Sequence, residues 1–483
     1  MLLHKSYRMA LLALISAGGI TSATAGQFTG PSSSQSPYLV PAKPGVSMIS
    51  LLTVGDSVNT KEDGITPYRM VGIPDGLAAF ANEDDETFTV LINHELPGTG
   101  IIRAHGFKGA FVSKWIIDRS SLKVLHGEDL IKHAWRWDVA TYSYQQVTNV
   151  FSRFCSADMA PLSAFYNART GKGYPGRIYL NGEESGTEGR AMAHLLDGNS
   201  YELPFLGKMA WENSVANGST GDKTVVMGTD DGAGGQVYVY IGEKQRVGSP
   251  IDRAGLSNGK LYGIKVTGFP AEDATNGIPS GTAFSCYGFG DVSAWSGVQL
   301  NTNSINAQVT TFLRPEDGCW DPSHPDDFYF VTTASFTGKS RLWKLHFNSL
   351  ADPAAGGSIE QVLTGSEGQK MMDNITINSR GQMIIQEDVG DNAHIGKVWS
   401  YNIASHLFEI VAQHDPDRFT PGSPNFLTQD EESSGVIAID QIFTPGFFLL
   451  DVQSHRPTDE ELVEDGQLLL MFVPPGKGLG KDK

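Results

Sequence analysis

Short β-strand patterns recur over more than 400 of the 483 residues of this chain, with little helical periodicity between them. Gly, Asp, Asn and Pro turns separate the strands, and many strands come as neighbouring pairs. One such pair, 224–228 and 236–241, flanks an Asp-Asp-Gly turn, and 381–386 with 397–402 is similar. A sandwich would be shorter. The pattern therefore predicts an all-β fold, a β-propeller of about six blades with loop insertions. The clearest strands are 88–93, 177–181, 224–228, 236–241, 260–266, 328–333, 341–347, 381–386, 397–402 and 447–453.

The composition agrees with this fold and excludes several classes of protein. Charged residues make up 19% of the chain and glycine contributes 55 residues, which suits a turn-rich extracellular protein. The net charge of −18 argues against a protein that tracks a nucleic-acid backbone. No apolar run reaches the roughly 20 residues that cross a bilayer, so we expect no membrane span. We therefore expect neither nucleic acid nor a membrane as a partner.

The first 25 residues resemble an export signal, with Lys5 and Arg8 before an apolar stretch and small residues at 23–25. No twin-arginine pair precedes the apolar run, which indicates export of an unfolded chain to the periplasm or the medium. We expect a leader segment over 26–65 that packs on the propeller, the propeller over 66–475 and a charged tail over 476–483. Three cysteines, Cys155, Cys286 and Cys319, allow at most one disulfide.

Acidic residues follow several predicted strands. Because the innermost strands of all blades run the same way along the channel, residues past strand ends should converge on one mouth. Converging carboxylates repel one another, and a cation that prefers oxygen ligands relieves the repulsion. The pattern predicts a metal site at that mouth, and its candidate residues are Glu95, Glu183, Glu184, Asp230, Asp231, Glu387, Asp388 and, as a histidine, His455.

Two short motifs bear on the chemistry. Residues 255–259 match the G-x-S-x-G elbow of serine hydrolases, but a loop precedes them and a strand follows, which is typical of a hairpin turn. The segment Arg314-Pro315-Glu316-Asp317 places an arginine fork, which can hold phosphate through two hydrogen bonds, two residues from a carboxylate that can bind a metal. Zinc-protease, thiol-redox, NTPase and nicotinamide motifs are absent from the sequence.

The order of short motifs from Asn93 to His455 resembles the PhoX family of secreted alkaline phosphatases, which are β-propellers with a metal cluster at one end of the channel. The matching segments are Asn93-His94-Glu95, Leu180 to Glu184, Leu206 to Glu212 with Thr224 to Tyr240, Arg314 to Asp317, Met372 to Asn374 with Gly381 to Asp388, and Ser433 to His455.

The resemblance implies a role for each matched residue. It makes Glu183, Glu184, Glu212, Glu316 and Asp373 ligands of the metal cluster. It makes Arg314 and Glu212 catalytic groups, and it makes Arg314, Asn93 and His455 contacts of the substrate.

Two positions depart from the family pattern. Gly182 stands where the family has the cysteine that bridges two iron ions, and Trp211 stands where it has histidine. Cys155 lies in a segment that resembles the family's R-x-C and is expected to be structural, so that no thiolate is expected beside the glutamates. Calcium is therefore the expected cofactor in place of iron.

The resulting expectation is a monomeric, calcium-dependent phosphoester hydrolase of the PhoX type that acts on small phosphoesters. Two alternatives remain open at this point. One is a non-catalytic calcium-binding propeller that has lost the activity, and the other is a lactonase-like calcium-propeller hydrolase.

Overall fold

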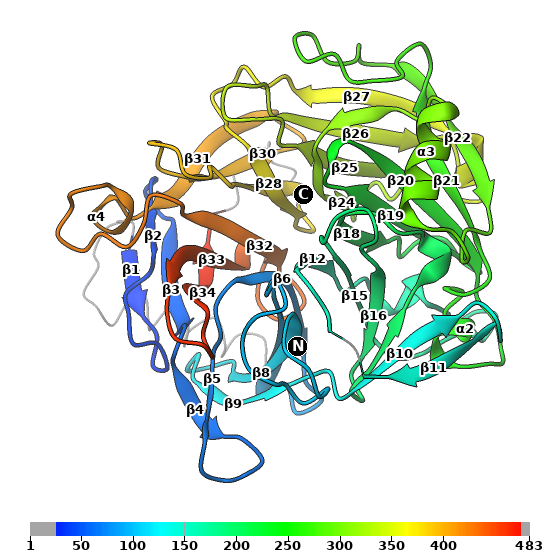
Figure 1. Ribbon diagram of the computed structural model, residues 1–483. Helices are drawn as coiled ribbons and strands as arrows, with labels where there is room; N and C mark the ends of the chain where they lie inside the picture. Colours follow the sequence, from blue (N-terminus) through cyan, green and yellow to red (C-terminus); the bar gives the residue numbers. More distant parts are fainter. Residues whose placement is uncertain (1–25, 149, 475–483) are drawn as a thin grey trace, which may run out of the picture.

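Six antiparallel blades surround a central channel in the computed structural model, which describes residues 26–148 and 150–474 (Figure 1). The expected export signal and the whole of the expected tail lie outside these residues. From the channel outward, the blades consist of β6 (Pro74–Ala81), β7 (Thr87–His94), β8 (Phe111–Asp118) and β9 (Val124–Asp129); β12 (Phe154–Asp158), β15 (Ile178–Glu183), β16 (Ala191–Leu195) and β17 (Asn199–Glu202); β18 (Trp211–Ala216), β19 (Lys223–Asp230), β20 (Ala233–Glu243) and β21 (Lys260–Val266); β24 (Pro315–Trp320), β25 (Asp327–Thr332), β26 (Arg341–Phe347) and β27 (Gly357–Leu363); β28 (Met372–Ile377), β29 (Gln382–Glu387), β30 (Lys397–Asn402) and β31 (Leu407–His414); and β32 (Glu432–Ala438), β33 (Phe447–Pro457), β34 (Glu464–Phe472) and β3 (Ser47–Thr53).

The innermost strands form a closed ring. In chain order, β6, β12, β18, β24, β28 and β32 each contact the next, and β32 contacts β6 again. The last blade closes the ring because its outer strand, β3, comes from the N-terminal part of the chain and pairs antiparallel with β34. The all-β propeller predicted from the sequence is therefore confirmed, with six blades in the described part of the chain.

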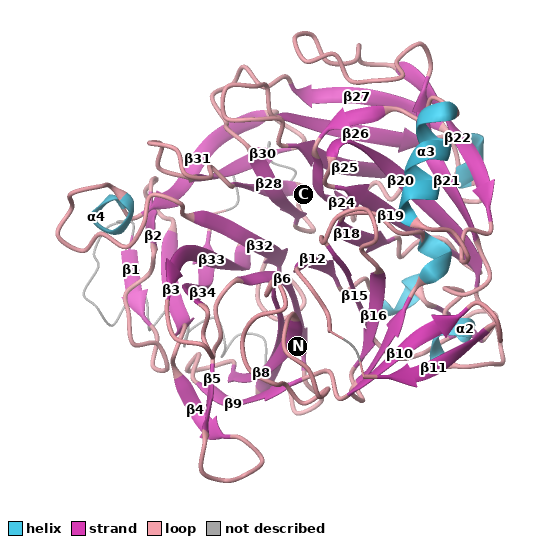
Figure 2. Ribbon diagram, viewed as in Figure 1, coloured by secondary structure: helices cyan, strands magenta, loops and turns pink. Residues whose placement is uncertain are grey.

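Smaller elements decorate the blades and account for the loop insertions. Strands dominate, and the few helices lie at the periphery (Figure 2). These elements are β1 (Gly26–Thr29), β2 (Leu39–Pro41), β4 (Ser57–Thr60), β5 (Pro67–Arg69), β10 (His133–Asp138), β11 (Ser143–Val147), β13 (Tyr166–Asn167), β14 (Lys172–Gly173), β22 (Thr282–Gly290), β23 (Thr311–Leu313), α2 (Pro250–Arg253), α3 (Gly297–Asn306) and α4 (Pro416–Phe419), with three short 3-10 turns. No helix in the described ranges is both long and apolar enough to cross a membrane.

All ten segments predicted as strands are strands, within one residue at either end or as part of a longer one. The segment 26–65, expected as a leader that packs on the propeller, instead supplies strands to two blades. Strand β3 is wholly buried in the sixth blade, and β2 pairs with β31 of the fifth. The apolar residues between blades form the core, and its largest fully buried side chains include Trp115, Trp211 and Trp343.

Candidate metal centre

The same local geometry recurs where each innermost strand begins. In all six blades the register between the innermost strand and the second strand shifts within the first residues, which marks a β-bulge. Bulges bend a strand and re-aim its side chains. In five blades the second residue of the innermost strand is an acid or a cysteine, and these residues are Asp75, Cys155, Glu212, Glu316 and Asp373.

The second strand of each blade runs antiparallel to the first and ends at this same mouth of the channel. Glu95, Glu184, Asp231 and Asp388 are the first residues past β7, β15, β19 and β29. The expectation that acids past strand ends gather at one mouth is therefore right, but the strands concerned are the second strands and not the innermost ones. Each of these blades thus delivers two side chains to the mouth.

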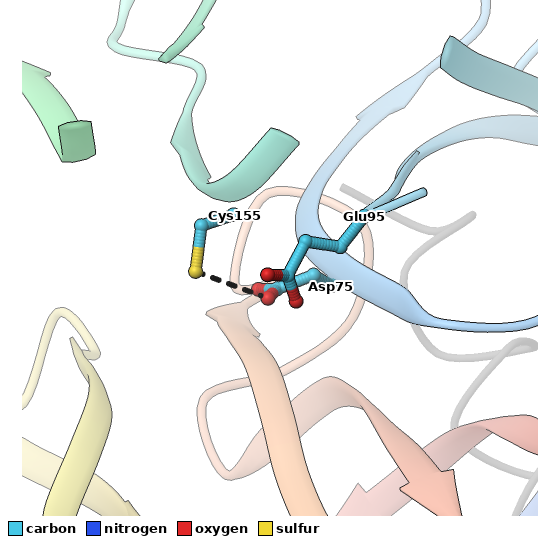
Figure 3. Close-up of side chains that lie close together, drawn as sticks. All are labelled: Asp75, Glu95 and Cys155. Carbon is cyan, nitrogen blue, oxygen red and sulfur yellow. Dashed lines mark hydrogen bonds between the residues drawn. The ribbon is translucent and has the colours of Figure 1, made fainter. Parts of the chain in front are cut away.

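The side chains meet in three overlapping groups whose ligand atoms lie within 4.8 Å of one another. The groups are Asp75, Glu95 and Cys155; Cys155, Glu184 and Glu212; and Glu212, Glu316 and Asp373. Figure 3 shows the first group, in which the Cys155 thiol points toward the Asp75 carboxylate, with Sγ 3.3 Å from Oδ2. Because Cys155 and Glu212 each belong to two groups, the three groups form one continuous centre.

These carboxylates are buried together with few donors. Burial, followed by repulsion from Asp231 and Asp373, raises the pKa of Glu316 well above its usual range. Burial raises the pKa of Glu212 to about 8. Within the described ranges, Asp75 Oδ1 is buried without a hydrogen-bond partner, and Glu316 Oε1 has an ion pair with Arg314 but no hydrogen bond. Since unpartnered buried oxygens are costly, this donor set fits one or more cations.

Two arginines face the centre from equivalent positions. Arg153 and Arg314 each stand two residues before a member of the centre, Cys155 and Glu316 respectively, and both have positive φ, 49° and 60°. Ile73 and Met371 stand at the equivalent positions of two other blades and also have positive φ, so this backbone geometry belongs to the repeated bulge. The repeat of the propeller therefore places the same side chain at the mouth twice.

The contacts of the two arginines are also alike. Arg314 donates two hydrogen bonds to Asp231, at 2.9 and 2.8 Å, and its Nη2 lies 3.1 Å from Glu316 Oε1. Arg153 contacts Glu95 at 2.7 Å and also pairs with Glu184. Their side chains are 36% and 44% exposed, so both guanidinium groups can reach a bound ligand.

His455 supplies a third cation at this mouth. Its Nδ1 and Nε2 lie 2.9 Å from Glu464 and 3.3 Å from Glu432. Burial acts to lower the pKa of His455, but the hydrogen bonds to these two carboxylates outweigh it and raise the pKa to about 11. The histidine is therefore positively charged at neutral pH.

Two residues singled out from the sequence lie apart from the centre. The Glu183 carboxylate pairs with Arg190, whose Nη2 donates at 2.6 Å, and belongs to none of the three groups. Asn93 is fully buried, and its amide donates to the Cys155 carbonyl and accepts from Tyr179 and Asn181 at 3.0 and 2.9 Å. Asn93 thus holds the strands that carry the centre and presents no free group to a ligand.

The structure corrects the expectation for the thiolate. A Cβ atom on Gly182 would lie 2.2 Å from the Trp211 Cβ, so no larger side chain fits there. The thiol that accompanies the glutamates is Cys155, which was expected to be structural. Burial, with Asp75 and Glu212 nearby, raises the pKa of this thiol, so in the absence of a cation it is protonated.

The sequence analysis did not name Asp75 or Arg153, and it did not place Cys155 in the centre. A signal was present, because the second residue of the inner strand is followed by a small or polar residue in each case: Asp75-Gly76, Cys155-Ser156, Glu212-Asn213, Glu316-Asp317 and Asp373-Asn374. Such pairs favour turns and bulges. They stand at the start of one strand pair after another.

Comparison with known proteins gives a fold but no family. No family model matches the chain, and neither does any curated protein. The solved structure of PhoX from Pseudomonas fluorescens, in complex with the transition-state analogue vanadate, is similar with a TM-score of 0.65 and 11% identity over 90% of this chain and 97% of that chain. At that identity the similarity shows the fold alone, so the chain has a PhoX-like β-propeller fold.

Two further similar structures are more distant. Regucalcin from Agrobacterium tumefaciens, described as a calcium-binding protein, has a TM-score of 0.33 and 11% identity over 83% of this chain and 90% of its own. A putative 6-phosphogluconolactonase from Bacteroides uniformis has a TM-score of 0.33 and 13% identity over 75% and 94%. Scores this low carry no argument about this chain.

Proposed function

We propose that this protein is a metal-dependent phosphoester hydrolase of the PhoX type, which releases phosphate from small organic phosphoesters. The observation that carries the proposal is the pairing of a buried carboxylate and thiol centre with two equivalent arginines at its edge. Carboxylates alone would suit a structural cation, but two half-exposed arginine forks above them suit a ligand that is itself an anion.

The residues divide the work as follows. Asp75, Glu95, Glu184, Glu212, Glu316 and Asp373 would hold the cations. When bound, such cations neutralise phosphate charge and lower the pKa of coordinated water. Arg314 and Arg153 would each hold phosphate oxygens and share the negative charge that develops during transfer. His455, positively charged between Glu432 and Glu464, would add a third cationic group.

Cys155 widens the choice of metal. Calcium prefers oxygen ligands such as carboxylates, whereas a thiolate selects softer ions such as iron. We propose calcium at the all-carboxylate group of Glu212, Glu316 and Asp373. The two groups that share Cys155 fit a thiophilic ion, including the iron that the sequence analysis set aside. Export of the chain and a monomeric state remain part of the proposal.

Hydrolysis of p-nitrophenyl phosphate by purified protein, before and after EGTA and re-addition of calcium, tests the proposal. Arg314→Lys and Arg153→Lys should retain metal by elemental analysis but raise KM and weaken inhibition by inorganic phosphate, because lysine keeps the charge and loses the two-pronged geometry. As a matched control we suggest Arg246→Lys, an exposed arginine outside the mouth.

The outcomes separate the alternatives. Metal binding without turnover of any phosphoester would leave the two alternatives, and lactone hydrolysis would then distinguish the lactonase-like hydrolase from the non-catalytic calcium-binding propeller. Turnover that is unchanged in both mouth variants would remove the arginines from the mechanism.

A further inference from the structure

A cavity of about 390 Å³ opens beside the metal centre, and we call it the rim pocket. Its polar lining consists of the cations Arg136, Arg190 and Lys208, the hydroxyls of Ser152 and Ser185, and the carboxylates of Glu183 and Glu188. We propose that the rim pocket binds a second anionic group, a phosphate or a carboxylate, at the far end of the phosphoester substrate. This inference rests on the proposed function and names the substrate class.

The pocket holds hydrogen-bond donors that no residue described by the structure uses. Its floor is the buried Arg190 and Glu183 pair, which is neutral as a unit. Arg136 Nε lies 3.5 Å from Glu202, which is at the limit of a hydrogen bond. Lys208 Nζ lies 3.7 Å from Glu188, which is an ion pair too long to be a hydrogen bond.

The remaining donors are the hydroxyl groups of Ser152 and Ser185 at the edge of the pocket. Arg136, Lys208 and these two hydroxyls have no hydrogen bond from their side chains to any residue in 26–148 or 150–474. Arg190 and Glu183 cancel, so Arg136, Lys208 and Glu188 leave one net positive charge and unfilled donors in this lining, in a chain whose net charge is −18. A ligand that accepts several hydrogen bonds and carries negative charge matches this surface.

The pocket adjoins the catalytic mouth through the chain itself. Ser152 immediately precedes Arg153, and Ser185 immediately follows Glu184. Side chains of successive residues in an extended strand point to opposite faces. Accordingly Glu183 takes part in the rim pocket while Glu184 takes part in the metal centre. A substrate that lies across this rim would place one phosphate beside Arg153 and its other end against Lys208.

The test compares hexanediol bisphosphate with hexyl phosphate, which differ only in the second anionic group, and includes phosphohexanoate as the carboxylate form. For the native holoenzyme we expect kcat/KM for the bisphosphate to exceed that for hexyl phosphate about tenfold, chiefly through KM, which corresponds to about 1.4 kcal/mol. Lys208→Gln and Arg136→Gln should each reduce this ratio several-fold, whereas Lys208→Arg should keep most of it. Lys132→Gln, at an exposed lysine outside the pocket, is the matched control.

A binding measurement keeps this inference separate from the proposed activity. Calorimetry with hexane bisphosphonate, which is not hydrolysed, should show weaker binding in Lys208→Gln than in the control whether or not the protein turns over any substrate. If hexyl phosphate and the bisphosphate are hydrolysed equally well, the rim pocket has no role although the proposed function stands. If the protein hydrolyses nothing but binding still depends on Lys208, the proposed function fails and the anion site remains. Equal binding by Lys208→Gln and the control would overturn the inference.

Discussion

Glu316→Gln should change the stability of the protein in opposite directions with and without metal. Without metal, Glu316 is repelled by Asp231, which Arg314 pairs, and by two carboxylates of its own group, Glu212 and Asp373, with ligand atoms within 4.8 Å. At an effective dielectric constant of about 20, each repulsion within the group costs about 3 to 4 kcal/mol when the groups are ionised. The attraction to Arg314 at 3.1 Å contributes about 5 kcal/mol on the same scale. The two repulsions outweigh the attraction by about 2 kcal/mol.

Removing this charge should therefore stabilise the metal-free protein by about 1 to 2 kcal/mol. The gain is smaller than the full net repulsion because the glutamine amide does not replace every contact of the carboxylate. In a domain of this size, that corresponds to a rise in Tm of about 1 to 2 °C. With calcium at about 100 times its Kd, the native protein should gain about 2.7 kcal/mol, and the variant should lose most of this gain because it lacks one ligand oxygen charge.

The assay is thermal unfolding in EGTA and in excess calcium at about pH 9, where the carboxylates are more fully ionised. Glu272→Gln provides a matched control. Glu272 is equally buried and pairs with a buried arginine, Arg341, at 2.6 Å, but it belongs to none of the acidic groups. Glu272→Gln should destabilise the protein to a similar extent in both conditions. If Glu316→Gln lowers Tm in EGTA, or keeps the full calcium gain, Glu316 is not part of a cation site.

Three further results are expected. Gly182→Ala should destabilise the protein by about 1 to 3 kcal/mol in denaturant titrations, because the new Cβ would lie 2.2 Å from Trp211. Gly232→Ala should cost much less, because its new Cβ would have its nearest contact at 3.7 Å. Equal effects of the two substitutions would contradict the packing described. Cys155→Ser should lose any iron but keep calcium by elemental analysis, and unchanged iron content would exclude the thiol as a ligand. Burial lowers the pKa of His414 to about 3, so its contribution to stability is complete above the unfolded value of about 6.5 and is lost as the pH falls toward 3. His414→Gln should consequently lose about 2 kcal/mol less stability than the native protein between pH 7 and pH 5, whereas His126→Gln, at an exposed histidine, should behave like the native protein.

The fold could be predicted because its signal is local. Strands such as 260–266 and 397–402 are short runs rich in apolar residues and bounded by turn residues, and no tertiary contact is needed to identify them. The role of residues 26–65 could not be found in this way. Whether β3 packs on a blade or belongs to one depends on its pairing with β34, more than 400 residues away, which a local pattern does not contain.

The candidate centre was predicted in part for a similar reason. Acids past the second strands are visible as acids that follow an apolar run, and Glu95, Glu184, Asp231 and Asp388 were found by that rule. Strand periodicity alone does not decide which of two adjacent glutamates faces the channel. Glu183 and Glu184 therefore looked alike in sequence, although one pairs with Arg190 and the other joins Cys155.

The blade repeat explains why Cys155 and Arg153 were not predicted as part of the centre. Each blade has one position at the second residue of its innermost strand, and five of the six carry a ligand type there, so a soft ligand in one blade can share a centre with hard ligands from its neighbours. Cys155 occupies that position in the second blade, as Glu316 does in the fourth. The residue two places earlier takes positive φ in both blades and is arginine in both. Position within the blade, and not distance along the chain from any glutamate, therefore determines which side chains meet. The same argument implies that Arg153 and Arg314 should respond alike to substitution by lysine, and a large difference between their phosphate affinities would show that the two blades are not equivalent at this mouth.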